Sequence, residues 1–251
     1  MLKFRLIARL DIKPPHLIKT VRLDGVRKVG DPAEYARRYN DEGIDEVVFL
    51  DVVASLYRRN GLHSLCERVT TDVFCPVGAG GGVRSVADAL SLLRSGADKI
   101  VVNTAAVERP GLIDDLANKI GSQSVVLQLD AKRHDRGWQV LTDGGRQETG
   151  LSAVDWAKTA IGRGAGEILC TSADHEGVGD GFDLDLTGEI ASLPVPVIAA
   201  GGFGKPDDAA KAWKAGASGV AIAGALHYGR TTLADIRRAL ANAGVPVREA
   251  A

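Results

Sequence analysis

Two aspartates stand at matching places in the two halves of the chain and have the chemistry of an acid–base pair. Asp11 ends the apolar run at 5–11, and Asp130 ends a similar run at 124–130. In a closed barrel of parallel strands the first and fifth strands lie across from each other, so these carboxylates are expected to face each other at the barrel mouth. Opposed carboxylates divide the work of general acid and general base when their surroundings separate their pKa values. The structural alternative for each aspartate is a helix cap or an ion pair with a nearby lysine.

Glycine-rich stretches in each half are typical of phosphate sites. The first half has AGGGVRS at 79–85 and NTA at 103–105, and the second half has AGGF at 200–203 and AGA at 223–225. Glycines let the backbone approach an anion, and a helix that begins just afterwards offers free N–H groups. Two such sites predict an elongated substrate with a phosphate at each end. A Gly-Gly pair alone would indicate only a turn.

Four charged residues of alternating sign precede or begin strand candidates at the opposite end of the expected barrel. These residues are Arg5, Glu46, Lys99 and Glu167. Around a barrel floor they predict a closed ring of ion pairs. A plug that seals the floor is the structural interpretation, and a conduit through the floor is the functional one.

The elements that position these residues follow from the pattern of apolar runs and amphipathic segments. Strands are expected at 5–11, 47–51, 73–78, 99–103, 124–130, 167–171, 195–200 and 219–223, and helices at 32–42, 85–95, 152–162 and 206–215, among others. Continuous apolar strands joined by crossover helices predict an α/β fold, a TIM (β/α)8 barrel, with an open doubly wound sheet as the alternative. Two segments are expected to be mobile loops: 12–31, a candidate lid, and 173–183, whose acids do not fit a calcium loop.

The sequence also repeats itself at half length. Gly81-Gly82 stands 120 residues before Gly201-Gly202, and Gly96-Ala97 stands 120 residues before Gly216-Ala217. We therefore expect one domain over 1–251, built from duplicated half-barrels at about 1–120 and 121–251.

The composition limits which partners and which cellular compartment are expected. A net charge of −1, with both signs mixed along the chain, gives no reason to expect nucleic acid as a partner. No apolar run approaches a membrane span and 1–5 lacks the apolar core of a leader, so a cytoplasmic protein is expected. Cys66, Cys75 and Cys170 are widely separated and are expected to be reduced thiols. No metal or cofactor is expected.

Several stretches resemble the cyclase subunit of imidazole glycerol phosphate synthase, the HisF family, over essentially the whole chain. They are FLDVVAS (49–55), GGGVRSVADALSLLRSGADKIVVNTAAV (80–107), DAKR (130–133), GAGEILCTS (164–172) and DGFDLDLT (180–187). The resemblance implies a lyase of histidine biosynthesis. In that reaction ammonia and a bisphosphorylated ribulosyl formimino-aminoimidazole carboxamide give imidazole glycerol phosphate and the aminoimidazole carboxamide ribotide.

The resemblance also implies roles for particular residues. Asp11 and Asp130 match the acid and base, and Lys19 and Asp51 match assisting residues. The candidate phosphate and substrate contacts are Gly81, Gly82, Asn103, Thr104 and Thr171, with Gly177, Gly201, Gly202, Gly224 and Ala225 at the second site. A class I glutaminase of the HisH type is the implied partner on the N-terminal face, near Asp98. Its ammonia would enter through a gate formed by Arg5, Glu46, Lys99 and Glu167.

Departures from the family pattern keep other functions open. The family usually has cysteine at Arg9, Asp-Gly at Pro14-Pro15 and serine at both Ala200 and Ala225. The stretches at 16–32 and 52–62 look more like a paralogous group associated with surface-polysaccharide synthesis, in which glutaminase-derived ammonia is used for sugar amidation. A non-catalytic ammonia channel or scaffold for a glutaminase, and a phosphosugar isomerase, are the remaining alternatives.

Overall fold

The computed structural model describes residues 3–57, 61–135 and 137–248. Residues 1–2 of the expected N-terminal run and residues 58–60 of the stretch at 52–62 lie outside the described residues.

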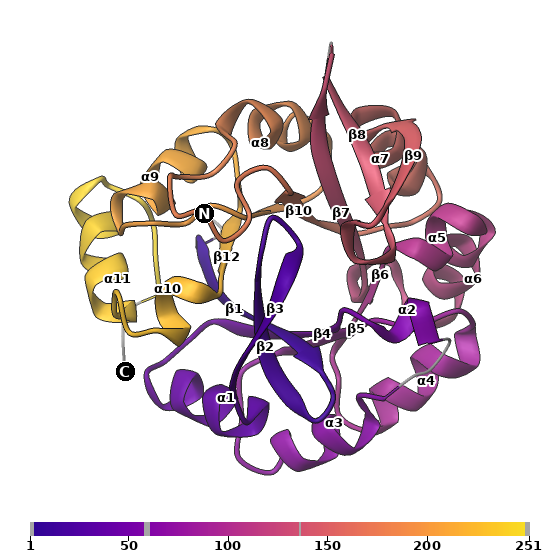
Figure 1. Cartoon of the computed structure of the whole chain (residues 1–251), viewed down its shortest axis with the longest axis horizontal. Coiled ribbons are helices and arrows are strands. Elements are labelled where there is room, and N and C mark those ends of the chain that lie inside the picture. Colours follow the sequence, from indigo (N-terminus) through magenta and orange to yellow (C-terminus); the bar gives the residue numbers. More distant parts are fainter. Residues whose placement is uncertain (1–2, 58–60, 136, 249–251) are drawn as a thin grey trace.

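Eight parallel strands form a closed barrel, because β7 pairs with β6 on one side and with β10 on the other (Figure 1). Their order around the barrel is β1 (Arg5–Lys13), β4 (Glu46–Asp51), β5 (Val77–Gly80), β6 (Lys99–Val102), β7 (Val125–His134), β10 (Glu167–Ser172), β11 (Val197–Ala200) and β12 (Gly219–Ile222). The predicted TIM barrel is confirmed, and the open doubly wound sheet is wrong.

Helices surround the barrel, and five of them begin at a polar side chain that accepts from the first turn. Asp31, Ser85, Ser152, Asp183 and Thr232 each accept a hydrogen bond from a backbone N–H two or three residues later, as N-caps do. The helices are α1 (Pro32–Asp41), α2 (Ala54–Tyr57), α3 (His63–Val69), α4 (Val86–Arg94), α5 (Thr104–Glu108), α6 (Gly111–Ile120), α7 (Ala153–Gly162), α8 (Leu184–Ala191), α9 (Asp207–Lys214), α10 (Gly224–His227) and α11 (Leu233–Asn242).

The alternation of side chains along each strand divides the core in two. On β1, Leu6 and Leu10 face outward and pack with residues from the helices. Ile7 faces inward and packs with side chains from the other strands: Val48, Leu50, Val101, Val126, Leu169, Ile198, Ala200 and Ala221. Because successive strand residues point to opposite faces, Arg5, Arg9 and Asp11 share the inward side with Ile7.

Two antiparallel hairpins extend the barrel strands at the mouth. β2 (His16–Val21) and β3 (Asp24–Gly30) follow β1, while β8 (Gly137–Thr142) and β9 (Gln147–Ser152) follow β7 (Figure 1). The expectation of an irregular loop over 12–31 is therefore wrong. The alternating HLIKTV segment pairs with the end of β1 and turns back through Arg22 and Leu23, both of which have positive φ.

The third barrel strand is displaced from its expected position at 73–78. It begins at Val77, because Val77–Gly80 pairs with β4 and β6. Pro76 has no N–H to donate to a ladder, and Phe74 is 85% exposed. Apolar residue types before a proline were thus mistaken for strand.

Positions that match across the two halves have similar backbone conformations. The φ angles are +98° at Gly81 and +82° at Gly201, and Asn103 (φ −135°, ψ −90°) resembles Ala223 (φ −123°, ψ −91°). The matching positions of the two expected halves therefore have similar backbone geometry, while the half-barrel duplication itself stays a prediction. The three cysteines are free, as expected, and none of the helices in the described ranges is long and apolar enough to cross a membrane.

Candidate functional site

Two cavities open at the carboxyl ends of the barrel strands. The first, of about 280 Å³, is lined from β1, β4, β6, β7 and both hairpins, and contains Asp11 and Asp130. The second, of about 240 Å³, is lined from the first hairpin, the loops after β10 and β11, and α10. Arg9 and Thr20 line both cavities. The two cavities therefore adjoin each other near the barrel axis, as an elongated substrate would require.

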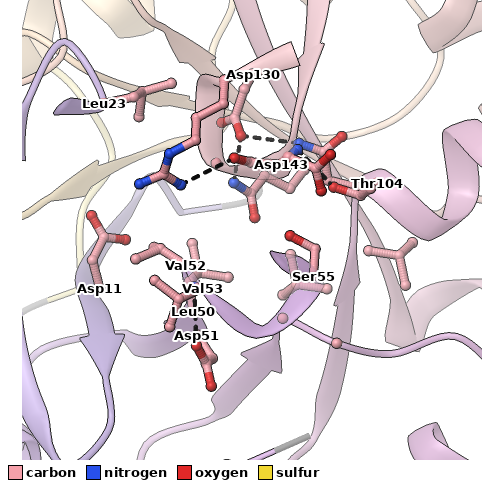
Figure 2. A pocket seen from close by; sticks show the side chains of 18 of the residues that line it. Asp11, Leu23, Leu50, Asp51, Val52, Val53, Ser55, Thr104, Asp130 and Asp143 are labelled. Atoms are coloured by element: carbon pink, nitrogen blue, oxygen red, sulfur yellow. Dashed lines mark hydrogen bonds between the residues drawn. The ribbon is translucent and has the colours of Figure 1, made fainter. Parts of the chain in front are cut away.

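Asp11 and Asp130 both point into the first cavity, from different sides (Figure 2). Each is 1% exposed. Within the described residues, Oδ2 of Asp11 and Oδ1 of Asp130 are buried without a hydrogen-bond partner. Each aspartate therefore keeps one oxygen that a reacting group can use. The two carboxylates therefore line one cavity at the barrel mouth, as predicted. Their catalytic roles stay a prediction.

The two carboxylates have different partners. Asp130 Oδ2 accepts from Asn103 Nδ2 at 3.0 Å and from Gln128 Nε2 at 2.8 Å. Burial raises the pKa of Asp130, an effect that Arg9, Gln128 and Thr171 oppose without cancelling. Asp11 Oδ1 instead accepts from Nε of Arg9 at 2.9 Å. Different surroundings are the condition under which two carboxylates divide acid and base work.

Arg9 is nearly as buried as the aspartates, at 2% exposure. Besides the bond to Asp11, its Nη1 donates to Thr171 Oγ1 at 2.9 Å. An isolated buried guanidinium would be costly, and these two contacts supply its partners from within the chain. Arg9 therefore needs no anion from the substrate as a partner. The presence of arginine at position 9 is then no reason to expect a substrate different from that of the family.

The first cavity has a backbone suited to an anion at Gly81 and Gly82. Gly81 has φ +98°, and an added Cβ would lie 2.3 Å from the carbonyl oxygen of Asp51, so only glycine fits this turn. Asn103 and Thr104 line the same cavity, and the Thr104 hydroxyl accepts from the Asp143 N–H at 3.0 Å. Four of the five contacts predicted outside the second site line this cavity together, and the fifth, Thr171, does not.

The second cavity is rich in cationic side chains. Lys19 lies there and pairs with Glu176. The predicted residues Gly177, Gly201, Gly202, Gly224 and Ala225 also line it, whereas Ala200 belongs to the apolar barrel interior. The cavity is also lined by Arg9, Arg27 and Arg230, so that with Lys19 four basic residues surround the carboxylate of Glu176. These charges favour a phosphate even without the serine hydroxyls that the family usually has.

Sequence reasoning missed Arg27, Arg230, Asp143 and Arg146 as cavity residues. Arg27 belongs to the first hairpin, and Asp143 and Arg146 lie at the turn of the second. The Asp143-Gly144 pair was an available hairpin signal, because such dipeptides mark tight turns between strands. In the first hairpin the turn is at Arg22 and Leu23, and Asp24-Gly25 already belongs to β3, so the dipeptide marks the turn only approximately. For Arg230 the sequence offers no comparable signal.

Two other predicted residues lie away from the cavity surface. Thr171 is completely buried and lines neither cavity, so its contact is with Arg9 rather than with open space. Asp98 is exposed next to the start of β6, and one of its carboxylate oxygens accepts from the Val77 N–H at 2.8 Å.

The four charged residues at the floor form the predicted closed ring. Arg5 pairs with Glu46 at 2.9 Å and with Glu167, and Lys99 pairs with both glutamates at 2.8 Å. Burial raises the pKa of Glu46 more than its cations lower it. Burial also acts on Glu167, but hydrogen bonds and charge from Arg5, together with Lys99, outweigh it and lower the pKa of Glu167. The four charges close the barrel floor, an arrangement that suits both a gate and a plug.

Among the described residues there is no group of three or more histidine, cysteine, aspartate or glutamate side chains that would hold a metal ion.

Comparisons with known proteins give a consistent relationship. The model of a family described as histidine biosynthesis protein matches residues 5–232. A protein of Legionella pneumophila is 53% identical over 210 residues, which cover 83% of this chain and 99% of that protein. Proteins of Thermococcus gammatolerans and Pyrococcus furiosus are each 45% identical over 249 residues, 99% of both chains. All three are named imidazole glycerol phosphate synthase subunit HisF.

Proposed function

Because this chain belongs to the histidine biosynthesis protein family, we propose that it is the cyclase subunit of an imidazole glycerol phosphate synthase. It is a lyase subunit that uses ammonia to convert the bisphosphorylated ribulosyl formimino-aminoimidazole carboxamide into imidazole glycerol phosphate and the aminoimidazole carboxamide ribotide. The observation that carries this proposal is the pair of buried aspartates in the first of two adjoining cavities, each of which has glycines for close backbone approach.

The substrate is proposed to span both cavities. One phosphate is assigned to Gly81, Gly82, Asn103 and Thr104, and the other to the cationic second cavity with Lys19 and Gly202. In this arrangement the reacting centre lies between the phosphates, beside Asp11 and Asp130. One carboxylate takes a proton from the attacking nitrogen, and the other gives a proton to the departing aminoimidazole carboxamide. Asp51, at the end of β4, lines the cavity next to this centre.

Ammonia is proposed to come from a glutaminase of the HisH type that docks at the floor of the barrel, near Asp98. The charged ring closes that floor, and the apolar layer around Ile7 lies above it. Ammonia would pass the ring and travel along the apolar interior to the aspartates. The compartment implied by this pathway is the cytoplasm.

The test is turnover of the ribulosyl formimino substrate by the purified chain with an ammonium salt at mildly alkaline pH, followed by the loss of substrate absorbance. Formation of both products, with nitrogen from ¹⁵N-ammonium in the imidazole ring, is the expected result. A folded chain that binds the substrate but gives no ammonium-dependent product would refute the proposal.

A further inference from the structure

Arg9 is a buried charge in the centre of the barrel, at the boundary between the two cavities. It follows Ile7 and precedes Asp11 on the inward side of β1. The position therefore lies between the apolar interior and the reacting carboxylates. A side chain placed there can influence both aspartates without being on the surface of the protein.

The contacts of Arg9 with the two aspartates are unequal. Nε donates directly to Asp11 Oδ1 at 2.9 Å. Nη1 donates to the hydroxyl of Thr171, the residue of β10 that is in register with Asp130 on β7. Arg9 thus makes an ion pair with Asp11 and reaches Asp130 only through Thr171 and through space.

We propose that Arg9 is a positioning residue that assigns the two roles in the acid–base pair: it holds Asp11 as the carboxylate that accepts a proton, and it leaves the proton to be donated on Asp130. This inference rests on the proposed cyclase function and states how its site works.

The surroundings of Asp130 fit the proton-donating role. The groups that donate hydrogen bonds to Asp130 are the neutral amides of Asn103 and Gln128, whereas the group that donates to Asp11 is the cationic guanidinium of Arg9. Burial raises the pKa of Asp130. Within the described part of the chain one oxygen of each aspartate has no hydrogen-bond partner, so one carboxylate has an oxygen to accept a proton and the other has an oxygen to give one.

Other charged groups near the pair come from several elements, and of those in the described ranges none makes the hydrogen bond to Asp11 that Arg9 makes. Lys19 on β2 is paired with Glu176 after β10. Asp51 ends β4 and caps the Val53 N–H at 3.1 Å. His227 on α10 bonds the Tyr39 hydroxyl, and burial lowers its pKa to about 4, so it is neutral at pH 7.

A purely structural role would not require an arginine at this place. A buried ion pair is often replaced by apolar residues of similar volume with little change in stability. The proposal therefore predicts that the charge at position 9, rather than its volume, decides the protonation of the pair.

The experiment compares wild type with Arg9→Lys, which keeps the charge, and Arg9→Met, which keeps much of the length without the charge. Two readouts are taken: the pH profile of kcat/KM with ammonium chloride, and the carboxyl ¹³C resonances of the Asp11–Asp130 pair in the free protein. Asp11→Asn and Asp130→Asn assign the resonances. Thermal unfolding of each variant shows that it is folded at the temperatures used.

The proposal expects the acid limb of the Arg9→Met profile, which reports the proton-accepting carboxylate, to move to higher pH by about 1–3 units and further than the other limb, because the cation that is removed contacts Asp11 directly and Asp130 only through Thr171. The ¹³C titration of the pair moves in the same direction. Both readouts in Arg9→Lys stay within about half a unit of wild type, since the opposite charge that sets them is retained.

Unchanged limbs and an unchanged ¹³C titration in folded Arg9→Met would overturn the proposal. A rise in KM alone, with both limbs in place, would do the same and would make Arg9 a substrate contact. Failure of the cyclase function is a separate result: wild type would give no product, while the ¹³C titration would still decide whether Arg9 controls the pair.

Discussion

At the residue scale, the proposed chemistry depends on two carboxylates that are equally buried but held by different partners. Arginine is the direct partner of Asp11, and two amides hold Asp130. The sequence predicted that these aspartates face each other, because the half-length repeat places them on opposite strands. It did not predict their surroundings: alternation puts Arg9 and Asp11 on the same side of β1, but the side-chain conformations that bring Nε of Arg9 to Asp11 and Nη1 to Thr171 depend on packing across the barrel.

Replacing either aspartate by asparagine is expected to lower kcat with ammonium by about 10²–10⁴-fold, the usual contribution of a positioned acid or base. The measurement is steady-state turnover of Asp11→Asn and Asp130→Asn at saturating substrate. Asp41→Asn, an exposed change at the end of α1, is the matched control and is expected to retain activity. Full turnover by both site variants, with circular dichroism showing native folds, would remove the acid–base assignment.

Asp130 also gives a prediction for stability as a function of pH. Its pKa is raised by burial from the ordinary value of 3.8, so ionisation is less favourable in the folded protein than in the unfolded chain. The folded state therefore loses stability as the pH rises from about the ordinary pKa of 3.8 through the raised pKa of the folded protein. The loss is about 1.4 kcal/mol for each pH unit between the two pKa values.

Asp130→Asn is expected to remove this loss, since its side-chain oxygen still accepts from Asn103 and Gln128. In urea unfolding the variant should be more stable than wild type at pH 7, and the advantage should vanish below pH 3.8. The opposite result would contradict this account of Asp130: a stability of Asp130→Asn, measured relative to wild type, that is lower at pH 7 than at low pH.

At the element scale, the loops after the strands form the proposed anion sites with backbone geometry that only glycine allows. Gly202 has φ +105°, and an added Cβ would lie 2.0 Å from the carbonyl oxygen of Gly181. The sequence predicted these loops because Gly-Gly pairs recur in both halves, and the loops do line the two cavities, whereas their binding of phosphate stays a prediction. It missed the two hairpins that complete the cavity walls, since their residues were assigned to a loop and to the connection before a helix.

Gly202→Ala is expected to destabilise the protein by about 2–4 kcal/mol and to raise KM for the substrate, because the collision is with backbone. Gly244→Ala is a matched control: φ there is +73°, and an added Cβ meets no atom within 4 Å. The control should cost only about 1 kcal/mol. Equal losses of stability in urea unfolding would mean that the close approach to Gly181 is unimportant.

The cationic wall of the second cavity predicts a binding effect rather than a chemical one. Arg230→Gln is expected to raise KM by about 10-fold with little change in kcat, since a phosphate contact is made in the ground state and the transition state alike. Arg238→Gln, an exposed change on α11, is the control. An equal fall in kcat and kcat/KM for Arg230→Gln would instead place this residue at the reacting centre.

At the scale of the whole molecule, the barrel separates a charged floor from a reactive mouth by an apolar interior. The strand order and the two-half pattern were predictable because parallel strands with crossover helices leave few topologies. The floor ring was also predictable, since its members stand at or beside the first residues of β1, β4, β6 and β10. What the ring does was not predictable, because a plug and a gate need the same four charges.

Lys99→Met, tested in complex with the glutaminase, distinguishes a plug from a gate. A gate predicts that glutamine-dependent turnover changes by at least about 10-fold, while turnover with free ammonium changes far less. Lys119→Met, at the end of α6, serves as the control. Equal changes in both assays would indicate that the ring only seals the barrel floor.

The most direct test of the central claim is a crystal structure of Asp130→Asn with the ribulosyl formimino substrate bound. The account predicts one phosphate at Gly81 and Gly82, the other beside Lys19 and Arg230, and the reacting carbon between Asp11 and position 130. A substrate with both phosphates in one cavity, or bound away from the two aspartates, would contradict it.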